Sequence, residues 1–161
     1  FWKKPIINME YNSQLIFQSK FGNIKIISKE ERISNIDFTT ENIKNSNSKI
    51  LNVTKNQIEE YLFNDRKDFS IDTTLNGTAF QLKVWHQIKL IPYGMITTYL
   101  TIANILKTSP RAVGNACGKN PILLLIPCHR VIASNGELTG FSALGGTDTK
   151  KKLLDHEKVI I

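Results

Sequence analysis

Cysteine is scarce in this chain of 161 residues, which contains only Cys117 and Cys128. Two cysteines this close in sequence are too few for a disulfide framework or for a Cys-rich zinc site. Long apolar runs are also absent, because no stretch approaches the roughly 20 residues that a membrane-spanning helix needs. The sequence therefore predicts an intracellular, reducing setting, the cytoplasm or a eukaryotic nucleus, and no membrane partner.

Acidic residues are scarce in the second half of the chain. Residues 76–161 hold 10 Lys and Arg against 4 Asp and Glu, whereas residues 1–75 hold 11 against 10, so the formal net charge of +7 divides into +6 and +1. A basic half indicates a polyanionic partner, of which nucleic acid is the commonest. A basic surface without such a partner is the alternative that charge alone leaves open.

Residues 1–76 carry the pattern of strands followed by a helix. Two β-rich segments, 14–17 and 24–27, flank a glycine turn signal and predict a hairpin. Residues 33–38 predict a third strand, and the apolar spacing within 57–63 predicts a helix. A turn signal closes this half, so we place the domain boundary there and expect one domain over 1–76 and another over 77–161.

The second half is predicted to be mainly helical. Apolar residues recur at helical spacing in 80–88 and 99–106. Ser109 is a favourable N-cap, and Pro110 suits the first position of a helix that continues over 111–117. The last two helices, joined by a tight turn, form a candidate helix-turn-helix. This pattern alone leaves both DNA contact and ordinary helix packing open.

Cys128 follows a run of five large aliphatic residues, 122–126, and then Pro127. The run predicts a buried segment whose regular structure Pro127 ends, so that Cys128 emerges from a rigid apolar wall. The thiolate is the reactive form of cysteine, and two neighbours could favour it, His129 as a base and Arg130 as a fixed positive charge. A packed, unreactive cysteine is the alternative, since free cysteine is among the most buried residue types.

A longer series of motifs surrounds this cysteine. It runs through Ile91-Pro92-Tyr93-Gly94, Asn120-Pro121, Ile126-Pro127-Cys128-His129-Arg130-Val131-Ile132, Gly136, Thr139-Gly140-Phe141-Ser142, Gly145-Gly146 and Leu153-Leu154-Asp155-His156-Glu157. In this order the series resembles the O6-alkylguanine-DNA alkyltransferase family, the direct-reversal DNA repair proteins, and the resemblance extends over nearly the whole chain. It implies an α+β fold, with a small ribonuclease-H-like antiparallel sheet and a helix in 1–76. An all-helical, winged-helix-like alkyltransferase domain with the helix-turn-helix would then follow in 77–161.

The resemblance implies a repair reaction on double-stranded DNA that contains O6-alkylguanine, without a cofactor. Cys128 resembles the acceptor that takes the alkyl group and keeps it, so that each molecule reacts once. A thiolate suits this displacement at carbon, and the thioether that forms has no easy way back. His129 resembles the base that removes the thiol proton through a water, and Glu157 the carboxylate that orients it. Asn120 resembles a hinge residue that ties the helix-turn-helix to this segment, and Tyr99 resembles the tyrosine that assists the guanine leaving group.

The target base lies inside a duplex and must first be rotated out of the stack. Arg111 resembles the finger arginine that fills the gap, and Tyr99 also resembles a residue that crowds the adjacent phosphate. The other DNA contacts implied around this helix are Ser109, Ala112 and Gly114. The pocket for the flipped guanine is implied to include the Val131 carbonyl, Phe141 and the Ser142 amide.

Several properties stay open. The loop from Ser142 to Gly146 is longer than in many members of the family, so the size of the alkyl group and the reaction with O4-alkylthymine are undecided. Some members bind zinc in the first domain, but residues 1–75 here contain neither Cys nor His, so we expect no metal, and we expect a monomer. Two other classes fit parts of the pattern. One is a DNA-binding regulator with an inert or redox-sensing thiol, and the other is a cysteine hydrolase, which the adjacency of Cys128 and His129 disfavours.

Overall fold

The computed structural model of the chain describes residues 12–63, 65–139, 141 and 143–159. Its first part is an antiparallel sheet of three strands in the order β1 (Asn12–Ser19), β2 (Gly22–Lys29) and β3 (Arg32–Thr39). Alternate residues of β2, among them Ile24 and Ile26, are buried, as expected for a sheet with one face on a core. The three predicted strands are confirmed, and each extends beyond its predicted ends.

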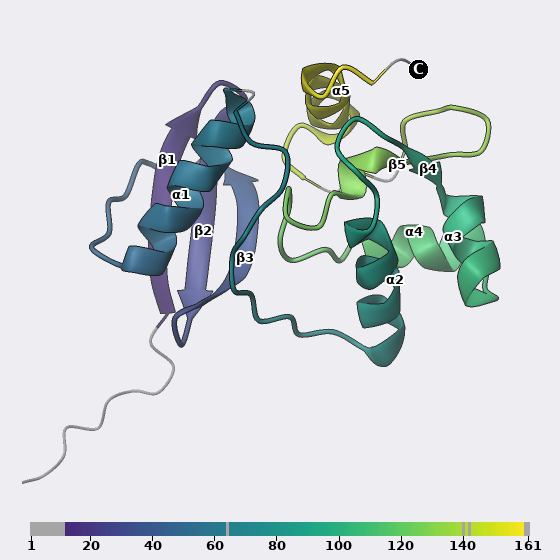
Figure 1. The fold of residues 1–161 in the computed structure, drawn as a ribbon, viewed down its shortest axis with the longest axis horizontal. Helices are drawn as coiled ribbons and strands as arrows, with labels where there is room; N and C mark the ends of the chain where they lie inside the picture. Colours follow the sequence, from purple (N-terminus) through teal and green to yellow (C-terminus); the bar gives the residue numbers. More distant parts are fainter. Residues whose placement is uncertain (1–11, 64, 140, 142, 160–161) are drawn as a thin grey trace, which may run out of the picture.

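Helix α1 (Lys49–Leu62) covers one face of this sheet (Figure 1). Its inward residues include Leu51, Ile58 and Tyr61, which recur at helical spacing and are fully buried. The side chain of Ser48 accepts a hydrogen bond from the Leu51 amide and so caps the helix. The helix begins eight residues before the predicted segment 57–63, and its first turns mix the apolar residues Ile50, Leu51 and Val53 with polar ones.

The second part of the chain is helical apart from one short parallel pair of strands. Its elements are α2 (Ala79–Lys89), β4 (Thr97–Thr98), α3 (Tyr99–Leu106), α4 (Pro110–Cys117), the 3-10 helix η1 (Cys128–Arg130), β5 (Val131–Ile132) and α5 (Gly146–His156), with β4 paired to β5. The helices predicted over 80–88, 99–106 and 111–117 are confirmed, whereas α5 is not indicated by the patterns above. None of the helices in the described part of the chain is long and apolar enough to cross a membrane.

Helices α3 and α4 form the helix-turn-helix. α3 ends at Lys107, whose backbone is left-handed with φ 56°. α4 begins after Ser109, whose side chain caps it by accepting a hydrogen bond from the Ala112 amide at 3.2 Å. The indole of Trp85, on α2, donates to the Ala116 carbonyl at 2.9 Å. This buried bond fixes α4 against α2, while the first residues of α4 remain exposed.

Backbone hydrogen bonds join the two parts of the chain. The amide of Ile36 in β3 donates to the Pro121 carbonyl at 3.0 Å, and the Leu123 amide donates to the Ile36 carbonyl at 3.1 Å. The edge of the sheet is therefore paired with the segment that leads to Cys128. Figure 1 shows the sheet and α1 beside the helical part, with the connection from α1 to α2 passing between them.

The apolar run 122–126 is mostly buried, but it is not a regular element, which corrects the prediction. The chain turns at Leu124, whose backbone is left-handed with φ 72°. The Ile126 amide closes the turn by donating to the Ile122 carbonyl at 3.0 Å. Consecutive apolar residues indicate burial, but they do not distinguish a strand from a buried turn.

Candidate active site

Cys128 opens η1 and is almost completely buried, with 4% of its surface exposed. Asn120 Nδ2 donates a hydrogen bond to the Cys128 sulfur at 3.1 Å, and the thiol donates to the Cys117 carbonyl at 3.7 Å. Burial raises the pKa of Cys128 well above its usual range, whereas the bond from Asn120 and the charge of Lys150 act in the opposite direction. The resting sulfur is therefore a protonated thiol that needs a base, with a donor already directed at it.

Asn120 makes further hydrogen bonds that cross the turn before Cys128. Its Nδ2 also donates to the Ile126 carbonyl at 2.8 Å, and its Oδ1 accepts from the Ile122 amide at 2.9 Å. Its own amide donates to the Cys117 carbonyl, at the end of α4, at 3.1 Å. One residue thus connects the helix-turn-helix, the buried turn and the sulfur.

His129 and Glu157 are in contact, with 2.5 Å between His129 Nε2 and Glu157 Oε2, and both are buried. Burial lowers the pKa of His129, and Glu157 opposes this shift. Burial would raise the pKa of Glu157, but the hydrogen bonds and charges of His129 and Arg130 hold it well below its ordinary value. The pair is therefore a neutral imidazole whose Nε2–H donates to an ionised carboxylate. In this tautomer Nδ1 carries no proton and is able to accept one.

Arg130 acts on Glu157, which corrects the expectation that it would perturb the Cys128 thiol. Its Nε donates to Glu157 Oε1 at 2.8 Å and its Nη2 to Oε2 at 3.1 Å. Its Nη1 donates to the Ile91 carbonyl at 2.7 Å. A two-pronged, buried contact of this kind is among the stronger charge-assisted pairs, and it keeps the carboxylate ionised.

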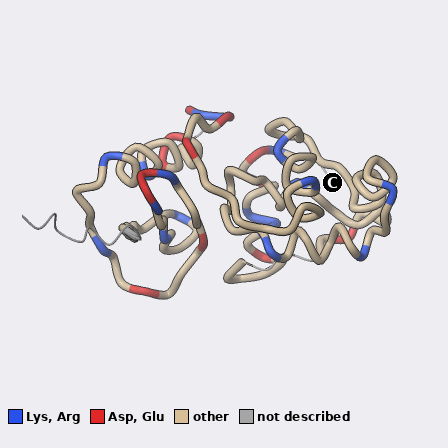
Figure 2. Tube along the Cα trace, turned by 90° about the horizontal axis from the view of Figure 1, so that it is seen from below, with Lys and Arg blue, Asp and Glu red and all other residues tan. Residues whose placement is uncertain are grey.

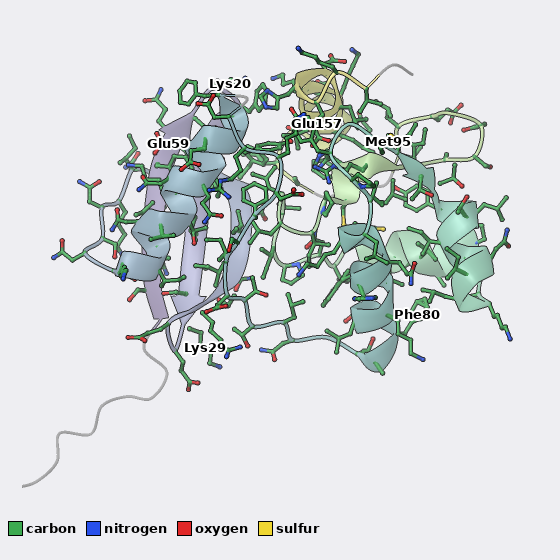
Figure 3. All side chains as sticks on the ribbon, in the orientation of Figure 1. Lys20, Lys29, Glu59, Phe80, Met95 and Glu157 are labelled. Carbon is green, nitrogen blue, oxygen red and sulfur yellow. The ribbon has the colours of Figure 1, made fainter. Side chains whose placement is uncertain are left out.

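Two more donors to Glu157 were not indicated by the sequence. The Gly94 amide donates to Oε1 at 3.0 Å, and the Tyr61 hydroxyl, from α1, donates to Oε2 at 2.6 Å. Gly94 has φ 77°, a left-handed conformation that favours glycine. Figure 3 shows Glu157 beneath α5, on the side of the helical part that faces α1. The site therefore draws on both parts of the chain.

Lys150 on α5 is fully buried beside the residues predicted to face the guanine. Its Nζ donates to the carbonyls of Val131 at 2.5 Å and Thr139 at 2.8 Å, and to the Tyr99 hydroxyl at 3.3 Å. The Tyr99 hydroxyl in turn donates to the Thr139 carbonyl at 2.7 Å. Burial lowers the pKa of Lys150 to about 8. Val131 and Tyr99 thus share one buried cation.

The sequence did contain a signal for Lys150. Its helical spacing with Leu153, Leu154 and Glu157 places a cation and a carboxylate on the apolar side of α5. Charged residues are almost never fully buried unless they are paired. A lysine and a glutamate in register with two buried leucines are therefore candidates for a buried polar site.

The remaining predicted pocket residues are only partly described. Val131 is fully buried in β5, and Phe141 is half-buried against the core. Ser142 lies outside the described residues, so the role of its amide stays a prediction. Within the described ranges, no group of His, Cys, Asp and Glu is arranged to hold a metal ion.

The residues predicted to contact DNA lie around the start of α4. Arg111 and Ser109 are exposed, and Ala112 is half-buried. A Cβ added at Gly114 would meet no other atom within 4 Å, so packing within the protein does not require glycine there. Figure 2 shows Lys and Arg distributed over the helical part, with few Asp and Glu between them. This end of α4 is therefore open to a polyanionic surface.

The geometry does not favour a cysteine hydrolase. Such an enzyme needs its base within hydrogen-bond reach of the thiol. Among the described residues, the Cys128 thiol bonds to Asn120 and to the Cys117 carbonyl, whereas His129 bonds to Glu157. Direct proton transfer from Cys128 to His129 is thus not set up in this arrangement.

Two family models match the chain, each over one of its parts. The model described as "6-O-methylguanine DNA methyltransferase, DNA binding domain" matches residues 79–159, and the ribonuclease-like domain of the same family matches residues 14–75. The chain belongs to the 6-O-methylguanine DNA methyltransferase family. A methylated-DNA--protein-cysteine methyltransferase of Metallosphaera sedula is 41% identical over 149 residues, which cover 90% of this chain and 92% of the relative. A protein of the same name from Methanosarcina acetivorans is 36% identical over 151 residues, covering 88% and 96%.

Solved structures of 6-O-methylguanine DNA methyltransferases share the fold over both parts of the chain. The Mycobacterium tuberculosis O6-methylguanine methyltransferase matches with a TM-score of 0.82 at 29% identity, covering 91% of this chain and 93% of that one. The complex of M. tuberculosis OGT with DNA matches with a TM-score of 0.80 at 31% identity, covering 89% and 91%. The predicted α+β fold, with a ribonuclease-like first part and a DNA-binding second part, is confirmed.

Proposed function

We propose that this chain repairs DNA by direct reversal, as a single-turnover methylated-DNA–protein-cysteine methyltransferase that takes the alkyl group of O6-alkylguanine onto Cys128. The observation that carries the proposal is a buried thiol next to a buried His129–Glu157 pair, in a chain of this family. The DNA complex of the M. tuberculosis relative and the basic second half of the chain support double-stranded DNA as the partner.

The reaction begins with the thiol proton. A water between Cys128 and His129 passes this proton to His129 Nδ1, and the imidazolium that forms faces the ionised carboxylate of Glu157. Arg130 remains bonded to both oxygens of that carboxylate, so Glu157 stays ionised while it stabilises the new positive charge. The Asn120 amide and the Lys150 ammonium favour the thiolate left on Cys128.

The sulfur then attacks the alkyl carbon of the flipped base. A C–S bond forms, the bond between that carbon and guanine O6 breaks, and its electron pair stays on guanine. The guanine anion takes up one proton from the Tyr99 hydroxyl, which turns away from the Thr139 carbonyl to donate it. His129 then releases the proton that it took from the thiol, and water carries that proton to the Tyr99 phenolate, so atoms and charges balance. The alkyl group is not removed from the Cys128 thioether again, because the thiolate is a poor leaving group at that carbon, and the reaction is therefore stoichiometric.

DNA is proposed to lie across the start of α4. Arg111 fills the gap left by the extruded nucleotide, and Ser109, Ala112 and Gly114 border the groove. Tyr99 crowds the neighbouring phosphate, and the flipped guanine is read by the Val131 carbonyl and the Ser142 amide, with Phe141 as a wall. We assign this chemistry to the domain 77–161 and propose that the protein acts as a monomer.

The proposal is tested with duplex DNA that contains one O6-methylguanine. Restored guanine is measured by chromatography after digestion of the DNA, at several ratios of protein to DNA. We expect one equivalent of guanine per protein and then no more, none with Cys128→Ser, and an unchanged yield with Cys117→Ala, which retains the backbone carbonyl near Cys128. More than one equivalent would refute the single-turnover mechanism, and tight DNA binding without restored guanine would favour a regulator.

A further inference from the structure

Tyr61 lies in the last turn of α1, in the sheet-bearing part of the chain, and its side chain is fully buried. Its hydroxyl donates to Glu157 Oε2 at 2.6 Å. Its backbone carbonyl is 2.7 Å from His156 Nε2, and its ring centroid lies 5.1 Å from that of His156. The hydroxyl and the backbone carbonyl of Tyr61 therefore both bond the segment that contains His156 and Glu157.

The direction of the hydrogen bond between Tyr61 and Glu157 is fixed by chemistry. Burial, and then the neighbouring negative charge of Glu157, raise the pKa of Tyr61 far above its ordinary value. Arg130 and His129 hold the pKa of Glu157 low. The phenol is thus the donor and the carboxylate the acceptor wherever the protein is folded and active.

Tyr61 and the Gly94 amide each add a donor to a different oxygen of Glu157. Arg130 bonds both oxygens and holds the plane of the carboxylate. Tyr61 bonds Oε2, the oxygen that His129 uses, and the Gly94 amide bonds Oε1. A carboxylate held at each oxygen cannot rotate, so the imidazole plane is fixed as well.

We propose that Tyr61 is a positioning residue of the alkyl-transfer site, through which the sheet-bearing part of the chain sets the orientation and basicity of the Glu157–His129 pair. The inference rests on the proposed function, because the transfer reaction gives this pair its task. A donor on Oε2 disperses part of the negative charge that would otherwise stabilise the His129 imidazolium. Without that donor, His129 becomes protonated, and inactive as a base, at a higher pH.

The test substitutes Tyr61→Phe, which removes one oxygen and leaves no new unpaired group in the core. The matched control is Tyr93→Phe, because Tyr93 belongs to the same ring cluster, with its centroid 5.9 Å from that of Tyr61. The Tyr93 hydroxyl bonds the His156 carbonyl at 3.5 Å, not Glu157. Thermal unfolding of the wild type and both variants is measured first. The reaction rates are then compared at a temperature at which all three proteins are folded.

Single-turnover rates are measured from pH 5.5 to 9 with excess protein over a duplex that contains O6-methylguanine. We expect Tyr61→Phe to slow transfer about tenfold at pH 7, equivalent to about 1.4 kcal/mol, and to move the acid limb of the profile to higher pH. Tyr93→Phe should keep the wild-type profile. In a Glu157→Gln background, adding Tyr61→Phe should not move the acid limb further, because its effect passes through the carboxylate. A wild-type profile for Tyr61→Phe, equal losses in both tyrosine variants, or a further shift in the double variant would overturn the inference.

A second readout separates this inference from the proposed function. Iodoacetamide alkylates Cys128 without DNA, and peptide mass spectrometry distinguishes that product from reaction at Cys117. The same shift of the acid limb is expected for Tyr61→Phe with this reagent. If the wild type modified no DNA while the iodoacetamide profile still shifted, the proposed function would fail and the role of Tyr61 would stand. If the protein repaired DNA but Tyr61→Phe shifted neither profile, the proposed function would stand and the role of Tyr61 would fail.

Discussion

The hydrogen bond from Asn120 to the reacting sulfur leads to a quantitative prediction. Asn120 Nδ2 lies 3.1 Å from Cys128 Sγ, and the substitution Asn120→Ala removes this donor while leaving His129 and Glu157 unchanged. A hydrogen bond to a charged group contributes about 1.5–3 kcal/mol, so its loss from the thiolate corresponds to a decrease in rate of about 10- to 100-fold at neutral pH.

The pH dependence of this loss has a definite sign. Burial already raises the pKa of Cys128, so the sulfur is a thiol at neutral pH, and losing the Asn120 donor raises that pKa further. The rate of the variant therefore falls furthest below that of the wild type at pH values at which Cys128 is still a protonated thiol. The difference should shrink as the pH rises and the thiolate forms in both proteins. Single-turnover transfer and iodoacetamide alkylation, each followed between pH 6 and 10, measure this convergence.

The companion variant Asn120→Asp separates the donor from the structural bonds of the side chain. Aspartate keeps an oxygen for the Ile122 amide, but it loses the donor and places a negative charge beside the sulfur. We expect it to react more slowly than Asn120→Ala, since like charges disfavour the thiolate. A loss that is equal at every pH in Asn120→Ala, or a faster reaction in Asn120→Asp, would refute the reasoning.

Three further predictions concern the DNA face and the buried lysine. Arg111→Ala should slow repair of duplex DNA more than reaction with the free base O6-methylguanine, and equal losses in single-turnover assays would count against a finger role. Gly114→Ala should raise the free energy of unfolding in denaturant titrations by about 0.5–1 kcal/mol and weaken duplex binding measured by anisotropy; unchanged affinity would contradict close approach of DNA. Lys150→Gln should slow transfer below pH 8, and the difference should shrink as the pH rises through the Lys150 pKa of about 8, where the native lysine loses its charge. A loss independent of pH would indicate a purely structural lysine.

The elements with local signals could be predicted from the sequence. The strands follow from β-branched residues that alternate around a glycine turn, and α4 follows from Ser109 and Pro110 at its start. Helix α5 has no such signal, because its first turns contain glycine, threonine, aspartate and lysine, and its apolar pair, Leu153 and Leu154, comes late. The composition of the run 122–126 does not distinguish a buried turn from a buried strand.

The residues of the candidate site likewise differ in whether a local sequence motif indicates them. Cys128, His129 and Asn120 stand in short motifs, and the family resemblance named them together with Glu157. The donors that surround Glu157 could not be predicted, because Tyr61 and Gly94 lie 96 and 63 residues from it in sequence. The sequence places Arg130 close to Cys128, but the direction of its guanidinium depends on where the end of α5 packs. Contacts of this kind are set by the tertiary fold alone.

The central claim is that Cys128 is a consumable acceptor. Its most direct test is the intact mass of the protein, with a peptide map, after incubation with duplex DNA that contains O6-methylguanine. The account predicts a gain of one methyl group per molecule, located on Cys128, with no gain in Cys128→Ser. A protein of unchanged mass after the guanine has been restored, or a methyl group located on Cys117, would contradict it.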